Sequence, residues 1–252
     1  MAEIPKIIHY CWLSNDQFPE DIQVCIDSWK NKLPNYEFKL WDFNCFDKES
    51  SVWVKQAFEN KKYAFAADYI RLFALYNYGG IYLDTDVEVL KSFDDLLYLP
   101  YFIGKEDSGY EIEAATIGSE KGCYWIKKCL EHYEKREFVI GFGKFDTAVL
   151  PSILKKKISN NYKFVSINSI IEFNSDEHNV CILPVDFFSP KKYDTNEVII
   201  TNNTYSIHHF RGSWSKNKTI KEKIRQKLSD ISINIGFYKL FRSVFKKKYH
   251  DK

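Results

Sequence analysis

The chain has 252 residues, of which 45% are hydrophobic and 28% charged, and its net charge is +2. The length fits one large α/β domain, or one domain plus an appendage, and the composition is ordinary for a soluble globular protein. No apolar run reaches the roughly 18–20 residues that cross a bilayer, and the N-terminus lacks the apolar core of a secretory signal. Six cysteines form no CxxC pair and no zinc spacing, so we expect reduced thiols in a cytoplasm.

The first 90 residues alternate between strand and helix patterns. Strands are predicted over 4–13, 36–43 and 81–90, and helices over 18–33, 51–62 and 64–80. Gly79 and Gly80 provide a stop for the last of these helices. The alternation indicates an α/β fold with an open, mostly parallel sheet flanked by helices.

The following part of the chain is more mixed. A strand and turn are predicted over 115–122, and helices over 123–135 and, after a Gly-rich start, 141–156. Strand patterns follow at 163–167, 180–183, 196–200 and 204–210.

The C-terminal segment is strongly basic. Residues 216–252 hold twelve basic and three acidic residues, a net +9, so residues 1–215 carry −7. Apolar residues recur every three to four positions from Ile220 to Phe245, which predicts a basic amphipathic helical tail with a break at Gly236. Such a tail either lies on an anionic membrane or packs on the domain, and its apolar stripe argues against a nucleic-acid partner. We expect a domain over 1–215 and a tail over 216–252.

Asp84 and Asp86 form the first candidate site. Alternate side chains of a predicted strand point to the same side, so these carboxylates repel each other unless a cation or proton neutralises them. Carboxylate oxygens suit Mg²⁺ or Mn²⁺, which can bridge a diphosphate. Other acid-x-acid pairs occur in the chain, so the motif alone is weak. Its position at the end of a strand in a β/α unit strengthens it.

Asp68 and Arg71 add to this candidate site. They lie three residues apart on a predicted helix and therefore share a face. The pair is either a surface ion pair or, because the helix is otherwise apolar, part of a cleft. There, an arginine fork can hold a diphosphate or sugar hydroxyls.

These motifs together resemble a known family. The segment YAFAADYIRLFALYNYGGIYLDTDVEVL (63–90) is similar to the core signature of the DXD-containing glycosyltransferases of family 32, which include capsule-synthesis transferases. It also resembles the glucosylating domains of large clostridial toxins. IPKIIHYCW (4–12) resembles the opening strand of the family, and IHHFRGSW (207–214) resembles its closing motif. The resemblance implies a GT-A fold and a retaining, metal-dependent enzyme.

The resemblance also implies a donor site. Trp12 matches an aromatic residue that stacks near the nucleotide base, although packing in the core is the alternative. We assign Tyr10 of the same strand to this site as well. Asp68 and Arg71 match residues that hold the donor sugar and diphosphate, and Asp84 matches an acid that contacts ribose or the donor sugar.

The metal ligands follow from the same comparison. Asp86 matches the direct ligand of Mn²⁺ or Mg²⁺, and His208 or His209 would add a contact from the C-terminal side. The spacing to Ser213 and Trp214 favours His208, and adjacent strand residues face opposite ways. Trp214 would close over the diphosphate and sugar, with Ser213 beside it.

The substrate-reading segments depart from the family pattern. Glu113, Ala114 and Ala115 stand where relatives often carry Asn, and GFGKFD (141–146) replaces a Gly-Pro. The sugar and acceptor therefore stay open. Glu113 and Asp146 are candidates for hydroxyl contacts, with ordinary surface acids as the alternative.

The resulting expectation is a hexosyltransferase. It would use a nucleotide sugar, with UDP favoured by analogy, and a saccharide acceptor carried on a lipid in surface-polysaccharide synthesis. The tail would attach it to the inner face of the cytoplasmic membrane. A protein-modifying, toxin-like transferase and a non-catalytic nucleotide-sugar-binding module are the alternatives.

Overall fold

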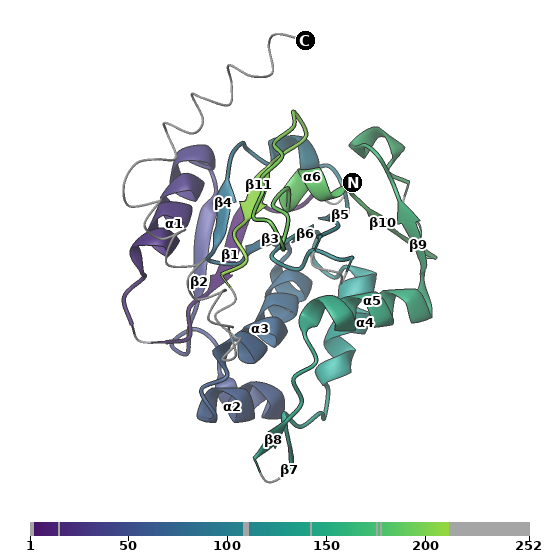
Figure 1. Cartoon of the computed structure of the whole chain (residues 1–252). Coiled ribbons are helices and arrows are strands. Elements are labelled where there is room, and N and C mark those ends of the chain that lie inside the picture. Colours follow the sequence, from purple (N-terminus) through teal and green to yellow (C-terminus); the bar gives the residue numbers. More distant parts are fainter. Residues whose placement is uncertain are drawn as a thin grey trace.

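The computed structural model describes residues 3–14, 16–107, 111–141, 143–174, 176 and 178–211 (Figure 1). The predicted tail over 216–252 and the end of the predicted domain lie outside these residues, so this division stays a prediction.

A five-stranded sheet forms the centre of the fold, in the order β2–β1–β3–β6–β5 (Figure 1). Its strands are β1 (Ile7–Cys11), β2 (Glu37–Trp41), β3 (Gly80–Leu83), β5 (Tyr101–Ile103) and β6 (Thr116–Ser119). β1 is parallel to both β2 and β3, whereas β6 is antiparallel to β3 and β5. β6 alone in this sheet therefore runs against the others, and the predicted α/β fold with a mostly parallel sheet is confirmed.

Helices cover both faces of this sheet. The α-helices are α1 (Glu20–Lys32), α2 (Val52–Glu59), α3 (Tyr63–Tyr78), α4 (Tyr124–Leu130), α5 (Leu150–Asn161) and α6 (Val185–Phe188). Short 3₁₀ turns lie at Lys48–Ser50, Asp94–Leu96, Glu131–Tyr133 and Ile170–Glu172. Trp29 of α1 shares one core with Ile8 and Ile81, and the opposite core joins Tyr82 of β3 to α2, α3, α4 and α5. The alternation of β3 side chains thus feeds two cores.

Three smaller pairs of strands surround the main sheet. β4 (Val87–Val89) pairs antiparallel with β11 (Ser206–His208), and β9 (Lys163–Ser166) pairs parallel with β10 (Asn179–Ile182). β7 (Val139–Gly141) and β8 (Lys144–Phe145) form a hairpin. The β4–β11 pair matters most for the site, because it joins positions more than a hundred residues apart.

Two of the strand predictions are wrong. The segment 81–90 is interrupted: β3 ends at Leu83, and the chain turns before β4 leaves the main sheet to pair with β11. The segment 196–200 forms no strand and makes only the isolated bridge between Val198 and Lys191. Ile199 and Ile200 are 49% and 50% exposed, so this apolar run buries no face that would fix it in a sheet.

Gly79 and Gly80 bring β3 against β1. Their φ angles are +67° and +104°, values that side-chain-bearing residues rarely adopt. A Cβ on Gly80 would also lie 2.7 Å from the carbonyl oxygen of Ile7. The double glycine therefore ends α3 and lets β3 enter the sheet next to β1, which fixes where the residues after β3 emerge.

Candidate active site

Asp84 and Asp86 lie in the turn between β3 and β4. The Asp84 N–H donates to the carbonyl oxygen of Ala115 (2.8 Å), and the Val87 N–H donates to the carbonyl oxygen of Asp84 (3.0 Å). The prediction that strand alternation places the two acids on one side is therefore wrong, because a tight turn brings them together. The turn follows the carboxyl end of β3, where open α/β sheets bind their ligands.

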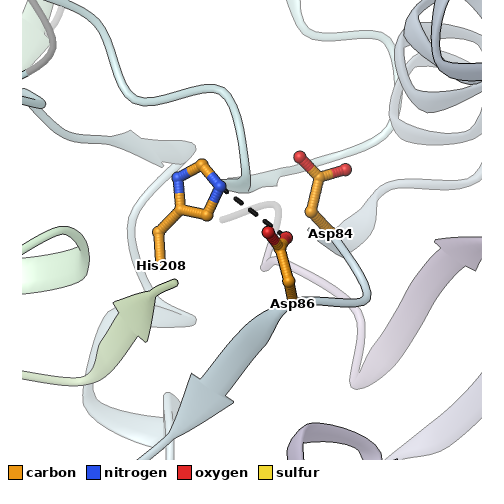
Figure 2. Close-up of side chains that lie close together, drawn as sticks. All are labelled: Asp84, Asp86 and His208. Atoms are coloured by element: carbon orange, nitrogen blue, oxygen red, sulfur yellow. Dashed lines mark ion pairs between the residues drawn. The ribbon is translucent and has the colours of Figure 1, made fainter. Parts of the chain in front are cut away.

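The end of β11 wraps around Asp86. His208 Nε2 lies 3.7 Å from Asp86 Oδ1. Figure 2 marks this pair with a dashed line, with Asp84 beside it. The backbone N–H of His209 donates to the Asp86 carbonyl oxygen (3.0 Å), and that of Arg211 donates to Asp86 Oδ2 (2.8 Å). Phe210 between them has φ +53°, a conformation that is uncommon for such a residue. This strained turn lets neighbouring segments hold Asp86 from several directions.

His208, not His209, faces the two acids. His209 Nε2 lies 3.1 Å from Glu88 Oε2, on the other side of β11. His208, Asp84 and Asp86 each offer one ligand atom, and these atoms lie within 4.8 Å of one another. Two carboxylate oxygens and an imidazole nitrogen form a set that suits Mn²⁺ or Mg²⁺, so the residues present fit the predicted metal.

Glu113 is a buried carboxylate behind His208. Its side chain is 0% exposed, and Oε2 lies 3.3 Å from His208 Nδ1. Its other oxygen accepts the backbone N–H of Ala115. A carboxylate only accepts hydrogen bonds, so Nδ1 of His208 carries the hydrogen and Nε2 faces Asp86. Glu113 is therefore placed to orient His208, the candidate metal ligand, and its burial excludes the predicted contact with a substrate hydroxyl in this arrangement.

Arg71 lies inside the protein rather than in an open cleft. It is 5% exposed and packs over the Tyr82 ring at 4.4 Å. Nη2 donates to Asp84 Oδ1 (2.8 Å), and Nη1 donates to the carbonyl oxygen of Ala114. Within the described residues, Nε is buried without a partner. Arg71 thus fixes Asp84 and the chain before β6, and in this arrangement its fork is not free to grip a diphosphate as predicted.

Asp68 joins two helices beneath the site. Its Oδ1 lies 3.4 Å from Arg71 Nη2, and its carboxylate accepts the backbone N–H of Leu150 at the start of α5. Burial raises the pKa of Asp68 to about 7, against the opposing effect of the Arg71 charge. The pair is therefore neither a surface ion pair nor an open donor-binding face.

Asp84, Asp86 and His208 affect one another's pKa values through their charges. Burial raises the pKa of Asp84, although the Arg71 charge opposes the shift. Burial acts to raise the pKa of Asp86 as well, but His208 and the Arg211 N–H outweigh it and lower that pKa. Burial acts to lower the pKa of His208, but Glu113 and Asp86 outweigh it and raise the pKa to about 10. A metal that bound to His208 would therefore have to displace a proton from it.

The remaining predicted donor residues lie nearby or outside the described part. Trp12 follows β1, and its half-buried ring packs on Phe18 with ring centroids 4.8 Å apart. Tyr10 packs its ring edge-on to Trp29 in the core. The parallel register of β1 and β3 places Trp12 at the same sheet edge as Asp84. Ser213 and Trp214 lie outside the described residues.

Sequence reasoning missed several supports of the site. The buried Lys191 donates from Nζ to the carbonyl oxygen of His209 (2.8 Å), and the Arg211 side chain pairs with Asp21 of α1. No local pattern marks these contacts, because each joins segments far apart in the chain. Asp146 was a candidate for hydroxyl contacts, but it pairs with Arg136 (Nε to Oδ2, 2.7 Å) beside the β7–β8 hairpin.

Parts of the chain are similar to known proteins. Residues 19–102 match the family described as "Glycosyltransferase sugar-binding region containing DXD motif", a range that includes Asp68, Arg71, Asp84 and Asp86. Mannosyl phosphorylinositol ceramide synthase SUR1 of Saccharomyces cerevisiae is 36% identical over 146 residues, which cover 54% of this chain and 37% of the relative. Inositol phosphoceramide mannosyltransferase 3 of Schizosaccharomyces pombe is 35% identical over 125 residues, 48% of this chain and 35% of the relative.

The chain thus spans a little over a third of the length of these relatives. Among solved structures, the PaToxG glycosyltransferase aligns with a TM-score of 0.48 and 21% identity, covering 63% of this chain and 69% of that one. The sequence matches support the prediction of a glycosyltransferase. In the described part of the chain, no helix has the length and apolar character to cross a membrane.

Proposed function

We propose that the chain is a metal-dependent glycosyltransferase that moves a hexose from a nucleotide sugar to a hydroxyl group of a lipid-linked acceptor. The observation that carries this proposal is the convergence of Asp84, Asp86 and His208, whose ligand atoms lie within 4.8 Å of one another at the edge of the sheet. The family match over 19–102 supports the same chemistry. A uridine diphosphate sugar is the first donor to test, by analogy with the resembling family.

Asp86 and His208 are the residues we propose to hold Mn²⁺ or Mg²⁺, with Asp84 beside them. When bound, the metal neutralises the charge of the leaving diphosphate. The surrounding residues hold these side chains before any substrate arrives: Arg71 fixes Asp84, and the Arg211 N–H fixes Asp86. Such preorganised groups stabilise developing charge without having to reorient during the reaction.

We propose that transfer retains the configuration of the donor sugar. In this mechanism the acceptor hydroxyl attacks the anomeric carbon from the face that the diphosphate leaves. The departing diphosphate takes the acceptor proton, so the step balances without a covalent intermediate on the protein. The chain supplies position and charge stabilisation. The anomeric configuration of the product, read by NMR, tests this step.

The acceptor we propose is carried on a lipid. Both yeast relatives named above carry inositol phosphoceramide, or its mannosylated form, in their names. Those names support a lipid acceptor bearing a polyol headgroup, and the capsular role expected from the resemblance has no counterpart in them. We therefore propose that the protein takes part in assembling a glycan on a lipid headgroup, and the proposal does not include a role in capsule synthesis.

We also propose that residues 216–252 attach the protein to the inner face of the cytoplasmic membrane. Support comes from the basic amphipathic pattern of this segment and its net charge of +9. Co-sedimentation with anionic liposomes tests the idea. Recovery with the liposomes should fall when residues 216–252 are removed, and equal recovery would contradict it.

Nucleotide release tests the proposed activity. The wild-type chain should release UDP from a UDP-hexose in the presence of Mn²⁺, first by slow hydrolysis and faster with an acceptor. Asp86→Asn should abolish both reactions, because an amide oxygen is a poorer metal ligand than a carboxylate, yet it can still accept the Arg211 N–H. Equal UDP release by this variant would contradict the proposed site. Binding of UDP without any release would favour a non-catalytic binding module.

A further inference from the structure

A cavity of about 320 Å³ includes Glu106 in its lining, a residue that lies close to His208. One wall is the segment after β5, with Lys105 and Glu106, and another is α5, with Lys155 and Ser159. The β9–β10 pair closes it with Phe164 and Ser166. None of these residues belongs to the donor or metal site described above.

Glu106 connects this cavity to the metal-binding candidates. A Glu106 carboxylate oxygen lies within 4.8 Å of ligand atoms of both Glu113 and His208. His208 Nε2 in turn lies 3.7 Å from Asp86 Oδ1. A molecule that contacts Glu106 in the cavity would therefore lie one side chain away from His208, which is itself a candidate ligand of the metal proposed to hold the donor diphosphate. Transfer requires this proximity, because the acceptor hydroxyl must come within about 3–3.5 Å of the anomeric carbon.

The lining indicates what kind of molecule fits. Two lysines and two glutamates balance in charge, and Lys155 Nζ pairs with Glu111 Oε2 at 2.7 Å. A ligand recognised mainly through negative charge would call for an excess of positive charge. Phe164, Ile182 and the carbon stems of the long charged side chains make much of the cavity wall apolar, but their charged ends and two serine hydroxyls line it as well. Carboxylates, ammonium groups and hydroxyls beside an apolar surface suit a ring that carries many hydroxyl groups, whereas an acyl chain would leave these polar groups without partners.

We propose that this cavity binds the polyol ring of the acceptor, a sugar or cyclitol, and presents one of its hydroxyls to the donor past Glu106. The inference rests on the proposed transferase function and adds the location and chemical class of the acceptor. Lys105 also lies on the cavity wall, where it can contact a phosphate attached to the ring.

Ligand-observed NMR tests the cavity with myo-inositol and myo-inositol 1-phosphate as probes, on the full chain with UDP and Mn²⁺. Ser159→Trp on α5 and Ser166→Trp on β9 each place an indole in the cavity from an exposed position. Asn160→Trp is the matched control, because Asn160 is exposed on the same helix and does not line the cavity.

Saturation transfer to the polyol should occur with the wild type and Asn160→Trp, and should fall at least about fivefold in both serine variants. In transfer assays, the KM for the acceptor should rise by at least about tenfold in the same variants. The proposal would be overturned by an unchanged NMR signal in both serine variants. It would also be overturned if the wild type gave no saturation transfer to either polyol. Thermal stabilisation of each protein by UDP and Mn²⁺ reports on the donor site separately. If the wild type shows no such stabilisation, the result would contradict the proposed function rather than the acceptor cavity.

Discussion

A buried histidine should make the fold sensitive to mild acid. His9 lies on β1 with 0% exposure, and its Nε2 lies 2.7 Å from the Gly79 carbonyl oxygen. Its Nδ1 accepts the Trp41 indole N–H at 3.1 Å. The neutral ring satisfies both partners, because one nitrogen donates while the other accepts. Burial lowers the pKa of His9 from 6.5 to about 4, so the charged form is disfavoured in the folded protein.

The sign of the effect follows from proton uptake. Below pH 6.5 His9 of the unfolded chain binds a proton, whereas His9 of the folded chain stays neutral until the pH falls to about 4. Stability from this group is therefore present above pH 6.5 and is lost as the pH falls toward 4. The linkage relation gives a loss of about 2 kcal/mol in the free energy of unfolding between pH 7 and pH 5.

Urea unfolding of the wild type and His9→Gln at both pH values measures this loss. A glutamine side chain can still accept from Trp41 or donate to Gly79, but it does not titrate. The free energy of unfolding of His9→Gln should therefore fall by about 2 kcal/mol less than that of the wild type between pH 7 and pH 5. The difference between the proteins isolates His9 from the other titrating groups. An equal loss in both proteins would refute the reasoning, because the acid sensitivity would then arise elsewhere.

Three further changes probe the supports of the site. Arg71→Lys should lower the rate of sugar transfer at least about tenfold and the free energy of unfolding by about 1.5–3 kcal/mol, because an ammonium group cannot keep both the Asp84 and Ala114 contacts. Full activity would show that Asp84 needs no such support. Glu113→Gln should weaken Mn²⁺ binding about 10–100-fold in titration calorimetry. The control His209→Gln changes a side chain that faces Glu88 and should leave Mn²⁺ affinity unchanged. Equal Mn²⁺ affinities of the two variants would show that Glu113 does not orient His208. Gly80→Ala should lower the free energy of unfolding by more than about 1 kcal/mol in urea, because of its positive φ and its approach to Ile7, and a neutral result would mean that β1 and β3 can separate without cost.

Local patterns predicted the elements that bury a face of their own. The helical spacing of Ile22, Ile26 and Trp29 marks the side of α1 that packs on the sheet, and the structure has that helix at Glu20–Lys32. The break after Leu83 could not be predicted in this way. It depends on β4 leaving the main sheet to pair with β11, a partner that no local period identifies.

The site divides along the same line. Asp84, Asp86 and His208 were predicted to lie together from motifs, and the structure brings them within reach of one metal. The burial of Arg71 could not be predicted from its i,i+3 spacing with Asp68, because that spacing indicates a shared helix face but not what covers this face. Ala114 and Tyr82 cover the guanidinium and turn an expected ligand-binding residue into an internal support. The supports given by Lys191 and the Arg211 N–H likewise arise from tertiary contacts.

Metal-dependent binding of the donor nucleotide at Asp86 can be measured by thermal unfolding with UDP and Mn²⁺, alone and together. A ligand that binds only the folded state adds about 2.7 kcal/mol at a hundredfold excess over its Kd. Wild-type stabilisation should require both UDP and Mn²⁺ and should disappear in Asp86→Asn. Equal stabilisation of the two proteins, or a wild-type shift with UDP that persists without Mn²⁺, would contradict metal-dependent donor binding at this residue.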